Sequence, residues 1–278
     1  MDRIFCWAID KMHDWHWQTW EGCQYLTCTL LEAWPHGFFT RQFQQQTLDE
    51  LATIMTPEAQ TYRVKQVHGN RILGSQDIRQ YRQLPKDPER LAFPEADGLV
   101  SDDHNQAMWV CTADCTPVLM ADAKTGQVAA VHAGWRGTAA KIVPVAIASL
   151  QKQGSRIADL RVAMGPAIAG QVYQVSTEVA VEVGASVVDP DAMQAQADVS
   201  ERLQHLPEPP VLKDEKPGHM RLDVRRVNAM QLEQLGLSGE QVAISPHCTY
   251  QDPERFFSYR RDNKKQVQWS GIVSRTPQ

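Results

Sequence analysis

Three residues combine the ligand types and the settings that a metal-dependent active site needs. Cys115 lies beside one short apolar run, and His132 ends the next, Val128–His132. His68 closes an earlier apolar run, directly before a Gly-Asn turn. Side chains at the ends of adjacent strands can be held rigidly and aimed at one point. Two imidazoles and one thiolate therefore predict a three-ligand metal site with an open fourth position.

Zinc is the metal that this ligand set suits, because one cysteine and two histidines leave a coordination position for water. Zinc lowers the pKa of that water toward roughly 7, and the resulting hydroxide suits hydrolytic deamination at an electrophilic ring carbon. An acid must then carry a proton to the departing ammonia. Asp114, next to Cys115, is the available carboxylate. Strand alternation points the two side chains apart unless the chain turns there, so support of the ligands is the alternative role for Asp114.

Each ligand candidate also has an ordinary structural explanation. A histidine before Gly-Asn is commonly a turn residue, and a buried cysteine often acts as a small hydrophobic side chain. His132 stands where an apolar strand meets a glycine-rich turn, so its ring can leave the core. Cys111 lies within an apolar run, and we assign it to the core.

Arginines occur in two settings that suit a substrate carrying an aromatic ring and an anion. Arg136 belongs to the loop 134–137 before a predicted helix, where backbone N–H groups and the guanidinium could hold an anion together. Arg260 and Arg261 lie in the aromatic loop 253–262, whose rings could stack on a nucleoside. The alternative is a surface loop whose aromatic residues only cap the core.

Short apolar runs separated by turns predict an α+β fold with at least one mixed sheet. The predicted strands cover residues 25–31, 62–67, 71–73, 98–101, 108–112, 118–121, 128–132, 160–164, 242–245 and 267–273. The predicted helices cover residues 47–55, 138–153, 177–183 and 223–235. Thr47 and Glu50 have capping-box spacing, and Pro144 marks a kink or a start nearer Val143 in the second helix.

The length of 278 residues and 42% apolar content predict one well-buried domain, 1–278, or two tightly fused ones. We favour the single domain. Five of the 16 prolines fall between Pro190 and Pro217. We therefore expect residues 188–218 to form an irregular insertion, serving as a lid or as a surface excursion without a role.

Charge, cysteine content and hydropathy exclude several classes of protein. A net charge of −5 leaves no basic face for nucleic acid. The apolar run Ile4–Ile9 is too short for a secretory or membrane-spanning segment, so we expect no membrane partner and a cytoplasmic location. The six cysteines are spread without an export signal, so we expect free thiols.

Six motifs in one order make the chain resemble the YfiH-like, laccase-domain-containing family from about Pro35 to about Val273. The motifs are Lys65-Gln-Val-His-Gly-Asn70, Ala96-Asp-Gly-Leu-Val-Ser101, Thr112-Ala-Asp-Cys115, Val131-His-Ala-Gly-Trp-Arg-Gly137, Met164-Gly-Pro166 and Phe256-Phe-Ser-Tyr-Arg-Arg-Asp262. The resemblance implies mixed β-sheets sandwiched with helices, a fold related to toxin domains with a Cys/His hydrolase centre. It also implies zinc on His68, Cys115 and His132, the set that the residues themselves suggest.

The resemblance implies purine nucleosides and phosphate as substrates, with phosphorylase activity on adenosine, inosine, guanosine and methylthioadenosine, and deamination of adenosine. Two alternatives are a metal-free amidase that edits peptidoglycan precursors, with Cys115 as nucleophile and His132 as base, and a copper-dependent polyphenol oxidase. Four-copper chemistry needs many histidines in His-X-His pairs, whereas this chain has nine histidines and no such pair. A single His-Cys-His site could still bind copper in place of zinc.

The chain departs from the family pattern at several points. Ala167 and Gln251 stand where the family often has cysteine, and neither change touches the three ligands. The usual Gly-Gly-Val-Ser after Thr-Arg and the Thr-Gly-Arg after Arg-Arg-Asp are both missing. Substrate contacts near Arg41 and Asn263 are therefore not carried over.

Overall fold

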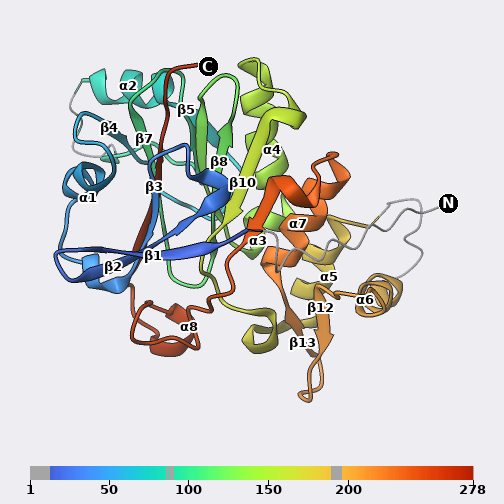
Figure 1. Ribbon diagram of the computed structural model, residues 1–278. Helices are drawn as coiled ribbons and strands as arrows, with labels where there is room; N and C mark the ends of the chain where they lie inside the picture. The colour runs from blue at the N-terminus through green and yellow to red at the C-terminus, as the bar shows by residue number, and fades with distance from the viewer. Residues whose placement is uncertain (1–12, 86, 88–90, 189–195, 278) are drawn as a thin grey trace.

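Two six-stranded sheets pack face to face in the computed structural model, which describes residues 13–85, 87, 91–188 and 196–277 (Figure 1). The first sheet has, in order, β1 (Trp15–Trp20), β2 (Cys23–Cys28), β3 (His36–Phe39), β15 (Gln268–Val273), β7 (Gln106–Thr112) and β4 (Gln60–Tyr62). The second has β14 (Val242–Ile244), β10 (Leu160–Met164), β8 (Thr116–Asp122), β9 (Val128–Ala133), β6 (Gly98–Val100) and β5 (Ile72–Gly74).

Both sheets are mixed, which confirms the prediction. β4 runs parallel to β7, and β10 and β6 run parallel to β14 and β5, while the remaining pairs within the two sheets are antiparallel. A third, three-stranded sheet contains β11 (Gln174–Ser176), β13 (His219–Leu222) and β12 (Val211–Lys213).

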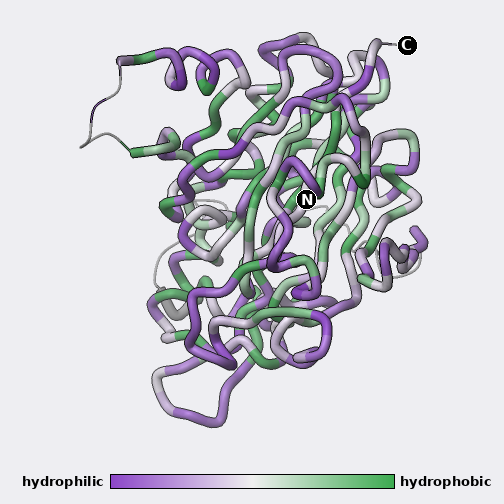
Figure 2. The backbone as a smooth tube through the Cα atoms, turned by 90° about the vertical axis from the view of Figure 1, so that its left-hand side faces the viewer, coloured by the Kyte–Doolittle hydropathy of each residue, from purple (hydrophilic) through white to green (hydrophobic). Residues whose placement is uncertain are grey.

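The described residues form eight α-helices. They are α1 (Leu48–Met55), α2 (Ser75–Gln83), α3 (Trp135–Ala139), α4 (Ile142–Lys152), α5 (Thr177–Ala185), α6 (Gln196–Gln204), α7 (Val224–Gln234) and α8 (Tyr259–Asp262). Leu51 of α1 packs with Trp109 on the outer face of the first sheet, and Ile147 of α4 and Leu232 of α7 pack on the outer face of the second. Hydrophobic residues accordingly follow the central strands in Figure 2. The fold is the expected α+β sandwich.

Residues 62–67 do not form the predicted strand, because β4 ends at Tyr62. The side chain of Gln66 takes over the edge of β7 beyond that point. Its Nε2 donates to the carbonyl of Cys111 at 2.7 Å, and the Cys111 N–H donates to its Oε1 at 2.8 Å. Cys111 is partly exposed there, so its assignment to the core is also wrong.

The predicted helix 138–153 is two helices, α3 and α4, separated by Lys141 in the left-handed region at φ 57°. Pro144 lies in the first turn of α4, where its missing N–H removes no helical hydrogen bond. Of the two predicted explanations for Pro144, the helix start nearer Val143 is therefore the correct one. The predicted strand at 25–31 is shorter, because 29–31 turn into a 3₁₀ helix. The Thr47–Glu50 capping box is present.

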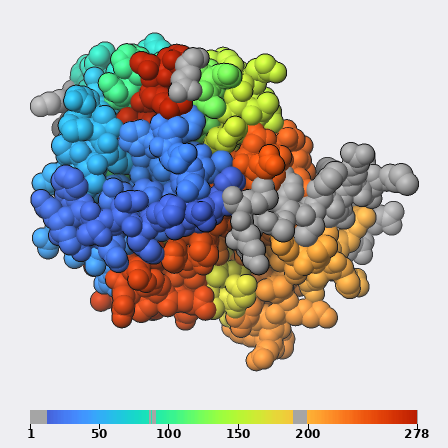
Figure 3. Space-filling view, in the orientation of Figure 1, coloured from blue at the N-terminus to red at the C-terminus, as the bar shows by residue number. Residues whose placement is uncertain are grey.

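The expectation of an irregular segment at 188–218 is wrong for its described part, which contains α6 and β12. Val199 and Leu203 of α6 pack on Gly184 of α5, where an added Cβ would lie 2.4 Å from Leu203. Helices α5 and α6 form a lobe with β12 and β13, which projects at the lower right of the space-filling view (Figure 3). The run Ile4–Ile9 lies outside the described residues, and within them no helix has the length and apolarity to cross a bilayer.

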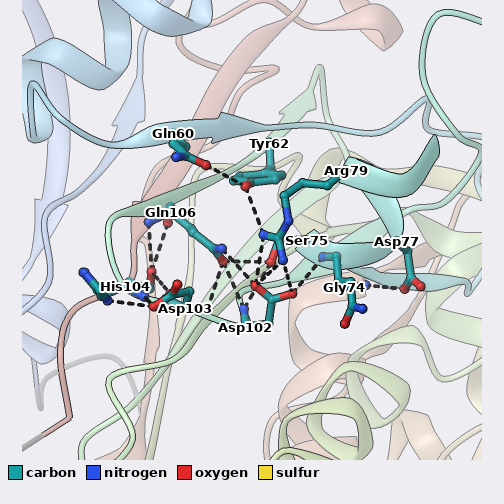
Figure 4. A network of polar contacts seen from close by, with 12 residues as sticks. Gln60, Tyr62, Gly74, Ser75, Asp77, Arg79, Asp102, Asp103, His104 and Gln106 are labelled. Atoms are coloured by element: carbon teal, nitrogen blue, oxygen red, sulfur yellow. Dashed lines mark hydrogen bonds and ion pairs between the residues drawn. The ribbon is translucent and has the colours of Figure 1, made fainter. Parts of the chain in front are cut away.

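A polar network ties α2 to the start of β7 (Figure 4). Asp102 accepts hydrogen bonds from the Arg79 guanidinium at 3.0 Å, the Gln76 N–H at 2.8 Å and the Gln106 side chain at 2.9 Å. Arg79 also donates to the hydroxyl of Tyr62 at 3.2 Å. The carboxylate has a structural partner on each side, and none of these partners belongs to the predicted ligand set.

Candidate metal centre

His68, Cys115 and His132 come together in the structure. Their ligand atoms all lie within 4.8 Å of one another, and they form the one group of this kind among the described residues. The two imidazole rings meet edge to face, with centroids 4.8 Å apart. His132 is buried, Cys115 is half-buried and His68 is exposed, so the group opens to solvent on the His68 side.

Connections between the two sheets carry two of the three side chains. Cys115 lies in the turn between β7 of the first sheet and β8 of the second, and His68 lies between β4 and β5, which also belong to different sheets. His132 stands near the end of β9, opposite Pro117 of β8. The fold therefore brings residues that are far apart in the sequence to one end of the sandwich, where these strands end.

The backbone at His68 has a φ of 63°, in the left-handed region that few non-glycine residues adopt. Such backbone strain persists only where the surrounding contacts hold it, and it is frequent at functional sites. The N–H groups of Val67, His68 and Gly69 all donate to the carboxylate of Asp97 at 2.7–3.2 Å. The turn predicted at Gly-Asn is thus present, and it holds the His68 ring beside Cys115.

Cys115 and His132 form a charge pair in the metal-free protein. Burial by itself raises the pKa of the Cys115 thiol, but His132 and then His68 outweigh burial and lower this pKa to about 6. Burial lowers the pKa of His132, whereas the Cys115 thiolate and Asp97 raise it to about 9. The sulfur is thus held as the thiolate, the form that binds a metal ion, and His132 releases a proton when it becomes a ligand.

Gly134 leaves space for two of the three side chains. A Cβ built on Gly134 would lie 2.9 Å from Cys115 Sγ and 3.4 Å from Cδ2 of His68. The backbone there has a φ of −77°, which any residue can adopt, so the crowding alone requires glycine. A soft thiolate and two imidazoles, clustered behind a glycine, fit zinc and also copper.

Asp114 lies in the turn before Cys115, with a φ of 93°, and its carboxylate joins two distant segments. One oxygen accepts from the Thr249 hydroxyl at 2.7 Å, and the other accepts from the N–H of Arg260 at 2.7 Å. The carbonyl of Asp114 accepts from the N–H of Ile168 at 3.0 Å. The chain does turn there, and the carboxylate holds the aromatic loop against the β7–β8 turn; a catalytic role for it stays a prediction.

The three predicted substrate arginines have different surroundings. Arg136 is exposed and lies over the ring of Trp135 at 4.2 Å, and the guanidinium of Arg260 lies 4.8 Å from the ring centre of Tyr173. Arg261 donates to the carbonyls of residues 249 and 250, just before its loop, to the carbonyl of residue 256 and to both carboxylate oxygens of the neighbouring aspartate. Its five N–H donors are all engaged, so Arg261 organises the loop.

Tyr173 links Arg136 and Arg260 to the ligand group. Burial, the main cause, raises its pKa to about 12; Cys115 raises it further, while Arg260 and Arg136 lower it. The phenol therefore shares one electrostatic environment with the thiol and with both cations. Sequence reasoning missed Tyr173, which follows the Gly-Pro motif at a distance that no simple pattern marks.

Asp97 is the second residue that was missed, although the motif Ala96–Ser101 contains it. Its carboxylate accepts from Nδ1 of His132 at 2.9 Å. Burial alone would raise the pKa of Asp97, but hydrogen bonds from His132 and from Gly69 outweigh that effect and lower it. The signal was an Asp-Gly step before a buried strand, which is also a common turn pattern.

The fold and the ligand group together define a protein with a cysteine–histidine centre at one end of a two-sheet sandwich. The family model described as "multi-copper polyphenol oxidoreductase laccase" matches residues 42–274. The chain belongs to this family, as the resemblance over 35–273 had indicated.

Relatives and solved structures agree with the family. The chain is 51% identical over 260 residues, 94% of this chain and 97% of the relative, to the purine nucleoside phosphorylase slr1573 of Synechocystis sp.. It is 29% identical to adenosine deaminase RL5 from an unknown prokaryote, over 65% of this chain and 63% of that one. The crystal structure of YlmD from Geobacillus stearothermophilus has the same fold, with a TM-score of 0.71 and 24% identity over 93% of this chain and 98% of that chain.

Proposed function

We propose that this chain is a zinc-dependent purine nucleoside phosphorylase that also deaminates adenosine and cleaves methylthioadenosine. The observation that carries the proposal is the convergence of His68, Cys115 and His132 within 4.8 Å. The names of relatives, a purine nucleoside phosphorylase at 51% identity and an adenosine deaminase at 29%, support the substrate class. We further propose that residues 1–278 act as one domain.

The three side chains would hold the ion, with Cys115 as a thiolate and both histidines neutral. When bound, zinc supplies a Lewis acid that lowers the pKa of water and polarises the substrate. Copper is the alternative occupant, because imidazole and thiolate bind both metals. The described residues contain one such cluster, so they do not support the four-copper oxidase alternative.

Arg136 and Arg260 are the residues that we propose to bind phosphate. Both are exposed, both lie near Tyr173, and the Arg136 side chain makes only a ring contact with Trp135 among the described contacts. A guanidinium binds phosphate oxygens in pairs, and two of them near Tyr173 would neutralise the anion. Asp114 contributes by holding the N–H of Arg260, and Arg261 by ordering the loop that carries it.

Nucleoside turnover of the purified protein tests this proposal. We expect about one zinc per chain, phosphate-dependent cleavage of adenosine, inosine and methylthioadenosine, and release of ammonia from adenosine. Cys115→Ala should abolish both the zinc content and turnover. Cys111→Ala should preserve them, because Cys111 is a nearby thiol outside the ligand group. Metal-free protein that converts adenosine at the full rate would refute the proposal.

A second candidate, the Cys/His amidase, is favoured by one observation. Asp97, His132 and Cys115 form a hydrogen-bonded series in which the carboxylate orients the imidazole and the imidazole contacts the thiol. A thiolate that is paired with an oriented imidazolium is a nucleophile arrangement that needs no metal. This activity would survive chelators, would act on an N-acetylmuramoyl peptide, and would be lost on alkylation of Cys115.

A further inference from the structure

The carboxylate of Asp97 is fully buried and binds two segments of the ligand group at once. Its Oδ1 accepts from the His132 ring and from the N–H groups of Val67 and His68, and its Oδ2 accepts from the N–H groups of Gly69 and Val67. Four N–H donors therefore surround one carboxylate. In the metal-free protein the His132 imidazolium is one of these donors, and it compensates the buried charge together with the three backbone N–H groups.

Asp97 holds His132 through the main chain and through the side chain. It directly precedes β6, and its carbonyl accepts from the N–H of His132 at 2.8 Å, while its carboxylate accepts from the ring Nδ1 at 2.9 Å. A carboxylate is an acceptor, so Nδ1 carries the hydrogen and Nε2 remains available to an ion. Such an outer partner fixes the tautomer and the direction of a metal-binding imidazole.

The same carboxylate fixes the backbone that presents His68. Successive N–H groups around a left-handed residue form a concave anion site, and here the anion is a side chain of the protein itself. Gly137 closes the opposite side of this loop, because a Cβ there would lie 2.9 Å from the carbonyl oxygen of Gly69. The His68 loop is therefore confined between Asp97 and α3.

We propose that Asp97 is the positioning residue of the centre, orienting His132 through its ring and His68 through its backbone. The inference rests on the proposed metal site and adds a residue to it. One side chain then controls two of the three ligands, although it binds no ion itself. Removing the charge should loosen both histidines together while Cys115 stays in place.

Asp97→Asn is the appropriate variant, because asparagine keeps the shape and one carbonyl oxygen. Its amide would face N–H donors in place of the second oxygen, so at least one of the four hydrogen bonds must break. We expect zinc affinity, measured by competition with a chelator, to fall 10- to 100-fold. In the metal-free protein we expect faster amide hydrogen exchange at residues 67–69.

Asp102→Asn is the matched control. Asp102 is also hydrogen-bonded by backbone and side-chain donors, but it lies in the α2 network of Figure 4. We expect this variant to lower thermal stability while zinc affinity and exchange at 67–69 stay within twofold of the wild type. A general loss of packing would instead affect both variants alike.

The two readouts separate the possible failures. If Asp97→Asn binds zinc as tightly as the wild type does, the positioning role of Asp97 is overturned. Unchanged amide hydrogen exchange at residues 67–69 in the metal-free variant would also overturn it. Wild-type protein that binds no zinc would refute the metal centre itself. If Asp97→Asn does not fold, Asp97→Glu, which keeps the charge and shifts it by one methylene, should fold and show the same loss of zinc affinity.

Discussion

Replacing Gly134 by alanine tests the metal centre through a single added methyl group. The new Cβ would lie 2.9 Å from Cys115 Sγ and 3.4 Å from Cδ2 of His68. The best separation between such heavy atoms is about 3.5–4.0 Å, so full relief of this contact would displace the sulfur by about 0.6 Å or more. The backbone at φ −77° accepts alanine, so the displaced ligand is the main consequence.

A shift of that size exceeds the tolerance of about 0.2 Å in metal–ligand distances. We therefore expect Gly134→Ala to weaken zinc binding at least 10-fold and to lower the free energy of unfolding by about 1–3 kcal/mol, the usual cost of overpacking. Chelator competition measures the first quantity and urea unfolding of the metal-free protein measures the second.

Gly74→Ala is the control, because Gly74 is also the N-cap of a helix and has a φ of −75°. A Cβ there would meet only Asp77 Oδ2, at an ordinary 3.5 Å. The change from glycine to alanine at an N-cap is common to both variants, so its effect cancels in the comparison. Zinc binding by Gly134→Ala at wild-type affinity would contradict the assigned ligand geometry.

Three further predictions concern other parts of the chain. In metal-free protein at pH 7, iodoacetamide should modify Cys115 before Cys111, because the pKa of Cys111 is raised to about 11, mainly by burial, and that of Cys115 is lowered to about 6; equal rates, followed by peptide mass spectrometry, would contradict this. Burial lowers the pKa of His36 to about 4, so as the pH falls the imidazole is protonated in the unfolded chain before it is protonated in the folded protein. The free energy of unfolding should therefore drop by about 3 kcal/mol between pH 6.5 and pH 4. Urea unfolding measures this pH dependence, and His36→Gln should flatten it. Arg261→Ala should lower the free energy of unfolding by about 2–4 kcal/mol, because its hydrogen bonds to carbonyls and a carboxylate are lost. Arg260→Ala should raise the KM for phosphate with a smaller loss of stability. If Arg260→Ala were the more destabilised variant and Arg261→Ala had the higher KM, their assigned roles would be reversed.

The three ligands could be predicted because each stands at a place where an apolar run gives way to a turn. Local sequence records such a change directly, and strand pairing then brings the turns together. Asp97 could not be predicted in the same way. Its role depends on the loop 65–70 lying beside it, and no local pattern encodes a contact between N–H groups and a carboxylate 28 to 30 residues away.

The errors in secondary structure have the same physical origin. Helix α6 offers only Val199 and Leu203 as an apolar stripe, too little to mark an amphipathic helix by periodicity. The close approach that Gly184 allows compensates for the narrow stripe. At 62–67 the composition favours a strand, but Gln66 satisfies the neighbouring backbone with its side chain and so replaces a strand extension.

The course of the chain at Cys115 and His68 has a mechanical consequence. Each of these residues lies on a crossing from one sheet to the other, and His132 belongs to a strand of the second sheet. An ion that all three residues hold would tie the two sheets together at the ends of their strands. Its binding free energy would then add to the cohesion of the whole fold, so the melting temperature would rise with the logarithm of free metal concentration.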